Sequence, residues 1–170
     1  MEIDKKDHLL KQGMSVLDLG ASPGGWSQYV CEKTGSKGTI VAVDILPMKE
    51  IEHVKFINGD FTENSVYQQC LEEFNNRRID LVISDMAPNL SGIRVKDQAN
   101  SIYLAELSMD MACKLLKPGG NLLVKVFQGE GVDGLRNQLK AHFDRVLIRK
   151  PQASRDSSRE FYILSKQFTL

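Results

Sequence analysis

The chain has 170 residues, of which 42% are hydrophobic and 26% are charged, and its formal net charge is zero. This length gives one domain a sizeable core and excludes two domains of ordinary size, so we expect a single domain over residues 1–170. No apolar run reaches the roughly 18 residues of a membrane span, and the first residues lack the basic-then-apolar pattern of a secretory signal. We therefore expect a cytoplasmic protein without a membrane segment.

Strands and helices are expected to alternate along the chain. Residues 1–13 are polar and end in a predicted loop at 11–13. Apolar and β-branched runs then predict seven strands, the first beginning at Ser15 and the others at 39–44, 54–57, 80–84, 121–127, 145–149 and 160–166. Helical spacing of apolar residues and terminal signals predict helices at 25–34, 63–76, 98–116 and 132–142. This alternation favours an α/β fold with a mostly parallel seven-stranded sheet that carries helices on both faces.

A glycine-rich turn, Asp18-Leu-Gly-Ala-Ser-Pro-Gly-Gly-Trp26, joins the first strand to the first predicted helix. Gly20, Gly24 and Gly25 allow backbone angles and close approach that a side chain would block, and the helix start presents free N–H groups. The spacing departs from the G-x-G-x-x-G of dinucleotide folds, because Ser22 stands at the second glycine. We expect a nucleotide-like ligand without pyrophosphate cradling; a turn that serves packing alone is the alternative.

Acidic side chains follow three of the predicted strands. Asp44 ends the second strand about 20 residues after the glycine turn, where an α/β nucleotide fold places a carboxylate on ribose hydroxyls. Asp60 follows the third strand, for which capping of a turn is the alternative, and Asp18 ends the first. Together these acids predict a ligand rim at the carboxyl edge of the sheet.

Lys125 lies inside an apolar run, Leu122-Leu-Val-Lys-Val-Phe127. A lysine in a central strand costs several kcal/mol of desolvation unless it is paired or lies near an opening. Asp85, at the end of a neighbouring predicted strand, is the expected partner. The alternative is an edge strand from which Lys125 reaches solvent.

The cysteines and histidines are scattered, so we expect free thiols and no metal site; the cysteines are Cys31, Cys70 and Cys113. Charge is distributed unevenly. Residues 135–170 carry eight basic and three acidic side chains, a net charge of +5, which leaves −5 on the rest. This positive charge predicts a surface that binds RNA phosphates, and a solvated charged face is the alternative. The residues of the predicted surface are Arg145, Arg149, Lys150, Arg155 and Arg159.

Four stretches carry a family resemblance: Asp18–Val30, Ser84–Gly92, Val124–Gly131 and Lys150–Glu160. They resemble the class I S-adenosylmethionine-dependent methyltransferases, and among these the FtsJ-type ribose 2′-O-methyltransferases of large-subunit ribosomal RNA. The resemblance extends from about residue 10 to the C-terminus. It implies a Rossmann-like fold, with S-adenosylmethionine as cofactor and S-adenosylhomocysteine as product. The implied partner is ribosomal RNA within the large ribosomal subunit, and the implied enzyme is monomeric and bacterial; a mitochondrial origin is the alternative.

The resemblance also implies roles for individual residues. Lys125, Asp85 and Glu160 fall on the family's catalytic positions around a ribose hydroxyl, where the 2′-oxygen of a nucleotide, expected to be a uridine, displaces the sulfonium methyl group. The positions implied to bind the cofactor are Gly20, Gly24, Trp26, Asp44, Asp60 and Asp85, with Asp44 at the ribose, Asp60 at the adenine and Asp85 near the methionine. A core aromatic is the alternative for Trp26.

One departure from the family pattern concerns its first lysine, which would lie just before Met1. We therefore expect that a short N-terminal segment is missing, and that this chain binds S-adenosylmethionine but methylates poorly. A catalytically silent RNA-binding or ribosome-binding module, or a 2′-O-methyltransferase of transfer RNA or of an RNA cap, are the alternatives. A base amino-methyltransferase is disfavoured, since Asp85-Met-Ala-Pro-Asn89 offers no aromatic side chain on which a base would stack.

Overall fold

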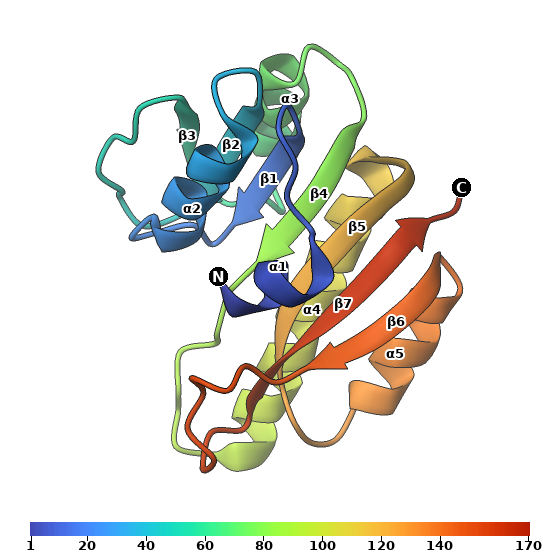
Figure 1. The fold of residues 1–170 in the computed structure, drawn as a ribbon. Helices are drawn as coiled ribbons and strands as arrows, with labels where there is room; N and C mark the ends of the chain where they lie inside the picture. The colour runs from blue at the N-terminus through green and yellow to red at the C-terminus, as the bar shows by residue number, and fades with distance from the viewer.

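The computed structural model describes residues 1–170 as one seven-stranded sheet with five helices (Figure 1). The strands are β1 (Ser15–Leu19), β2 (Thr39–Asp44), β3 (Val54–Asn58), β4 (Ile79–Ser84), β5 (Leu116–Phe127), β6 (Phe143–Arg149) and β7 (Glu160–Phe168). The helices are α1 (Glu2–Asp7), α2 (Gly25–Thr34), α3 (Asn64–Glu73), α4 (Arg94–Leu115) and α5 (Val132–Lys140).

The strand order is β3-β2-β1-β4-β5-β7-β6. Strands β1 to β5 pair in parallel, whereas β7 runs antiparallel to both β5 and β6. The predicted mostly parallel sheet is thereby confirmed. Because β7 is reversed, its first residue, Glu160, pairs with the last residue of β5, Phe127. The start of β7 therefore lies at the same edge as the carboxyl ends of the parallel strands.

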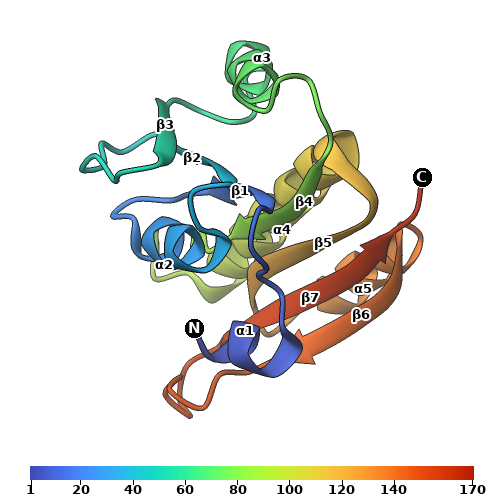
Figure 2. The same cartoon turned by 45° about the horizontal axis from the view of Figure 1, so that its top comes forward.

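Helices cover both faces of the sheet, as predicted (Figures 1 and 2). Helices α3, α4 and α5 bury the larger apolar cluster, of 26 residues, and α1 and α2 bury a cluster of 10. Side chains alternate along a strand, so Leu122 and Val124 join the larger cluster while Leu123 joins the smaller one. Lys125 follows Leu123 on the α1 and α2 side. None of the helices combines the length and the apolarity needed to cross a membrane.

Two elements differ from prediction. The polar N-terminal segment, for which no helix was predicted, contains α1, which is held by tertiary contacts: Asp4 accepts hydrogen bonds from the Leu10 N–H and the Tyr29 hydroxyl. Helix α4 begins at Arg94, four residues before the predicted start. Asp97 in its first turn accepts hydrogen bonds from the N–H and hydroxyl of Ser91, a local contact that apolar periodicity does not reveal.

Smaller differences concern the ends of elements. Strand β5 begins at Leu116, where it first pairs with Ile79, and the segment 117–120 interrupts the regular pairing with β4; α3 ends at Glu73. The helix α2 and its end at Gly35 agree with prediction; Gly35 has a φ of 67° and its N–H donates to the Cys31 carbonyl. The predicted order of strands and helices is otherwise confirmed.

Candidate active site

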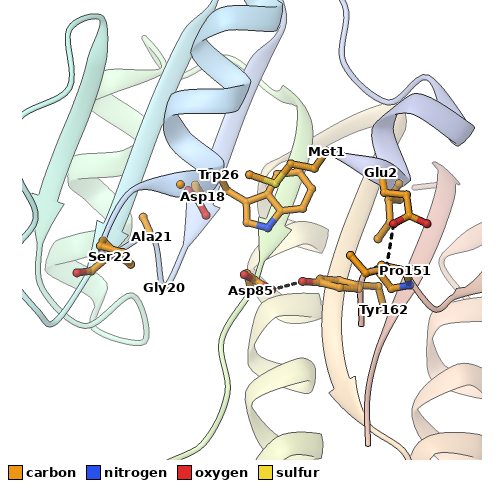
Figure 3. Close-up of a pocket in the computed structure, with 14 residues that line it drawn as sticks. Met1, Glu2, Asp18, Gly20, Ala21, Ser22, Trp26, Asp85, Pro151 and Tyr162 are labelled. Carbon is orange, nitrogen blue, oxygen red and sulfur yellow. Dashed lines mark hydrogen bonds between the residues drawn. The ribbon is translucent and has the colours of Figure 1, made fainter. Parts of the chain in front are cut away.

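A cavity of about 390 Å³ lies at the carboxyl edge of the sheet. Its walls come from the glycine-rich turn, the end of β4, strand β7, the segment after β6 and the N-terminal residues (Figure 3). The lining residues include Met1, Glu2, Asp18, Gly20, Ala21, Ser22, Trp26, Asp85, Pro151 and Tyr162. Segments far apart in the sequence thus meet around one opening.

Beside this cavity, the three residues that were predicted to be catalytic lie together. Lys125 Nζ lies 3.0 Å from Asp85 Oδ1 and 3.6 Å from Glu160 Oε2. The side chain of Lys125 is 15% exposed, so the two carboxylates offset the desolvation of a nearly buried ammonium. The alternative of a lysine that reaches solvent from an edge strand is wrong, since β5 lies between β4 and β7.

Tyr162 is a site residue that the sequence analysis missed. It pairs directly with Lys125 across the β5–β7 ladder, and its hydroxyl donates a hydrogen bond to Asp85 Oδ1. Burial, with the nearby Asp85 as a further cause, raises the pKa of Tyr162, so the phenol stays a donor. The signal was available: Glu160 and Tyr162 are two residues apart on one strand and therefore share a face.

Asp18, placed at the predicted rim without a specific role, is almost fully buried at the cavity wall. Its Oδ2 accepts a hydrogen bond from the Ser27 hydroxyl at 2.6 Å, but its Oδ1 has no partner in the protein. Burial raises the pKa of Asp18 to about 7, and the carboxylates of Asp85 and Asp44 contribute in the same direction. A buried carboxylate oxygen without a partner suits a ligand that brings a cationic or hydrogen-bond-donating group.

Two more cavities, of about 500 Å³ and 270 Å³, continue from the first. All three share Gly20, and the second and third share Asp44 and Met86. Gly20 has a φ of 68°, and a Cβ on it would lie 2.1 Å from Met86 Cγ, so only glycine fits there. The cavities form one elongated cleft along the sheet edge.

The acids at the far part of the cleft also organise its loops. Asp44 accepts hydrogen bonds from the N–H groups of Ser22 and Leu46, which ties the glycine-rich turn to the end of β2. Asp60 lines the third cavity and accepts hydrogen bonds from the N–H and hydroxyl of Thr62. Both acids thus lie in the cleft, and Asp60 is also the turn cap that was the alternative.

Of the two remaining positions that were predicted to bind the cofactor, Trp26 lines the cleft and Gly24 does not. Trp26 is 8% exposed, lines the first cavity and packs edge-to-face on Tyr29. Gly24 lines none of the three cavities of the cleft. It precedes α2 with a φ of 115°, and a Cβ there would lie 2.7 Å from Ile51 Cδ1. Its geometry concerns the turn and the packing of the segment after β2.

The five basic residues predicted to face phosphate divide into two groups. Arg149 is held by both oxygens of Asp7 at 2.8 Å, Lys150 donates to the carbonyls of Ser158 and Glu160, and Arg159 donates to Gln98. The contacts of Lys150 and Arg159 hold the segment that leads to Glu160, whereas that of Arg149 holds α1. Arg145 and Arg155 are exposed and make no such contact.

The fold and this site together define an S-adenosylmethionine-dependent methyltransferase of class I. A family model described as FtsJ-like methyltransferase matches residues 1–168. The chain is 51% identical to a "Ribosomal RNA large subunit methyltransferase E" of Stutzerimonas stutzeri over 99% of this chain and 82% of that protein. A protein of the same name from Legionella pneumophila is 53% identical over 99% of this chain and 82% of its own length.

Solved structures agree with this assignment. A provisionally assigned ribosomal RNA methyltransferase from Plasmodium falciparum superposes with a TM-score of 0.88 at 31% identity, covering 98% of this chain and 93% of that one. The fibrillarin/Nop5p complex, at 19% identity and a TM-score of 0.65, shares the fold over 98% of this chain and 79% of its own. The chain belongs to the FtsJ-like methyltransferase family.

Proposed function

We propose that the protein transfers a methyl group from S-adenosylmethionine to a ribose 2′-oxygen, with a uridine as acceptor, in large-subunit ribosomal RNA of a bacterial cytoplasm. The observation that carries the proposal is Lys125 held between Asp85 and Glu160 beside the cleft. The names of the bacterial relatives support the choice of RNA.

The cleft residues fit S-adenosylmethionine. The length of the cleft suits an extended nucleoside. We place Asp60 toward the adenine, Asp44 toward the ribose hydroxyls, and Asp85 and Trp26 toward the methionine. The unpartnered Oδ1 of Asp18 suits the cationic amino group of the methionine. Gly20 allows close approach, and Gly24 supports the site by setting the start of α2.

The chain's own residues mainly align and manage one proton. S-adenosylmethionine supplies a methyl group already activated by its sulfonium, so no strong base is required to start the reaction. We assign Lys125, once its ammonium has given up a proton to solvent, the task of accepting with its neutral amine the proton that leaves a bound 2′-hydroxyl and releasing it afterwards. Asp85 and Glu160 fix the position of its Nζ, and Tyr162 fixes Asp85.

The first test is transfer of labelled methyl groups to three substrates: large ribosomal subunits that lack ribose methylation, transfer RNA and capped RNA. We expect label on the subunits alone, in a nuclease-resistant 2′-O-methyl dinucleotide. Label on transfer RNA or on the RNA cap would show that this RNA, and not ribosomal RNA, is the substrate. No label on any RNA from either residues 1–170 or a version extended upstream of Met1, with the cofactor still bound, would favour the silent RNA-binding module or a different RNA substrate.

The family's first lysine stays a prediction. Met1 lines the first cavity, so a residue joined to it would emerge beside the site. A version extended upstream of Met1 by the family's sequence should methylate faster than residues 1–170, with equal affinity for S-adenosylmethionine. Equal rates would remove the need for that lysine.

A further inference from the structure

A second site lies outside the cofactor cleft. A cavity of about 590 Å³, larger than any of the three that form the cleft, opens between the first half of α4 and the loop that joins β5 to α5. No step of the proposed methyl transfer uses its residues. A cavity of this size is large enough for a nucleotide.

One wall of this cavity is apolar and partly aromatic. Ala99 and Ile102 line it from α4, together with Val95, which is 75% exposed, and Tyr103, which is 58% exposed. Opposite, the backbone at Gly131 packs so closely that a Cβ would lie 2.9 Å from Ile102 Cγ1. Exposed apolar and aromatic surface in a hollow suits a flat group with an apolar face, such as a nucleobase.

Two guanidinium groups border the same cavity. Arg159 stacks on the Phe127 ring at 5.5 Å and donates from Nη2 to Gln98, while its buried Nε has no partner in the protein. Gln98 is itself fixed by donating to the carbonyls of Phe127 and Glu130, at 2.9 Å and 3.0 Å. Arg94, at the start of α4, is exposed. One held and one free guanidinium suit a phosphate, which arginine binds through paired donors.

The cavity adjoins the outer part of the cofactor cleft. Tyr103 lines this cavity and also the two outer cavities of the cofactor cleft. Arg159 immediately precedes Glu160, and the two side chains contact opposite sides of the sheet: Gln98 of α4 and Lys125 respectively. A chain that places one ribose at Lys125 would therefore meet Arg159 with an adjoining nucleotide.

We propose that this cavity binds a nucleotide of the substrate RNA next to the one that is methylated. Its base lies against Ile102 and Tyr103, and its phosphate faces Arg159 and Arg94. Single-stranded RNA is recognised in this way, with splayed bases on aromatic or apolar side chains and phosphates on basic ones. The proposal rests on the proposed function, since it takes RNA as the acceptor.

The test fills the cavity without touching the cofactor cleft. Ala99 is exposed on α4, so Ala99→Phe adds a ring to the cavity, and Ala141→Phe adds the same ring to an exposed position after α5 as the matched control. We measure KM and kcat for unmodified large subunits, Kd for S-adenosylmethionine, and Kd for a fluorescent single-stranded RNA. Arg94→Glu is the second variant, because it changes charge and leaves the wall intact.

We expect Ala99→Phe and Arg94→Glu to weaken RNA binding about tenfold, with the affinity for S-adenosylmethionine and the melting temperature unchanged and Ala141→Phe equal to wild type. Unchanged RNA binding and KM in both variants would overturn the proposal. Loss of affinity for intact subunits but not for free RNA would assign the cavity to a ribosomal protein instead. If the wild-type chain methylates no RNA, the proposed function fails, and the RNA-binding measurement still decides on the cavity.

Discussion

Strand β5 carries a lysine paired with an aspartate at each of its ends, and the two pairs serve different purposes. Lys117 pairs with Asp80 at the amino edge of the sheet, where it is 51% exposed and where Asp80 also accepts the Ser15 N–H. Lys125 pairs with Asp85 at the carboxyl edge, is 15% exposed, and faces a second carboxylate and a phenol. The first pair joins strands, whereas the second places three polar groups around an opening.

The difference follows from position more than from residue type. Both pairs join β5 to the β4 segment, but only the carboxyl edge is lined by the glycine-rich turn and the acids near the ends of β1 and β2. Burying a lysine beside two carboxylates costs desolvation free energy, which is typical of functional sites. The opening beside Lys125 leaves room for a ligand to contact it. The following variants test this contrast.

A large effect is expected when the aspartate beside Lys125 is neutralised. Asp85→Asn should reduce kcat for methyl transfer by about a thousandfold, since it removes the charge that holds Lys125, although the amide oxygen can still accept from the Tyr162 hydroxyl. Asp80→Asn at the other end should leave kcat unchanged and lower the free energy of unfolding by about 1 kcal/mol. Steady-state methyl transfer measures kcat, and urea unfolding measures the free energy of unfolding. Equal loss of activity in the two variants would contradict the different purposes of the two ion pairs.

Tyr162→Phe removes one hydroxyl and keeps the ring beside Lys125. Because Asp85 then keeps its bond to Lys125, we expect a fall in kcat of about tenfold, with the affinity for S-adenosylmethionine unchanged. A purely structural role would instead lower the melting temperature and leave kcat near wild type. Rate and melting temperature measured on the same preparation distinguish the two.

Asp18 predicts a dependence on pH. Its pKa of about 7 in the folded chain exceeds the ordinary value of 3.8, so its contribution to stability is present at low pH and is lost as pH rises through about 7. A cationic ligand favours the carboxylate, so affinity for S-adenosylmethionine should rise over the same interval. Asp18→Asn should abolish both trends, as followed by unfolding and calorimetry; an unchanged pH profile in that variant would assign the trends to other groups.

The smallest effects concern the exposed basic residues. Arg145→Ala and Arg155→Ala should each weaken binding to RNA modestly and reduce the slope of log affinity against log salt by about 1. Arg149→Ala should instead lower stability, because it leaves Asp7 buried without its partner. If the salt slope changed in the Arg149→Ala variant and in neither of the other two, Arg149 would contact RNA phosphate, as the sequence predicted.

The sequence was sufficient where local patterns determine structure. Apolar runs gave the strands, and acids at the ends of β1, β2 and β4 had to meet at one edge once the strands were parallel. The catalytic roles of Asp85, Lys125 and Glu160 came from the family resemblance, and the register of β5 and β7 explains why these residues meet.

Long-range contacts could not be predicted from local patterns. Helix α1 has six mostly polar residues and depends on Asp7, which contacts a residue 142 positions away in the sequence. For the same reason Arg149 and Lys150 were predicted as free phosphate ligands, whereas the fold engages them in protein contacts. The orphan oxygen of Asp18 became visible only when its neighbours were placed.

The most direct test of the account compares two variants of β5, Lys125→Ala and Lys117→Ala, in single-turnover methyl transfer to unmodified large subunits. Each variant removes one lysine and one ion pair from the same strand. We expect Lys125→Ala to abolish transfer while it still binds S-adenosylmethionine, and Lys117→Ala to transfer at the wild-type rate. Transfer by Lys125→Ala at a rate near that of Lys117→Ala would contradict the assignment of Lys125 as the catalytic residue.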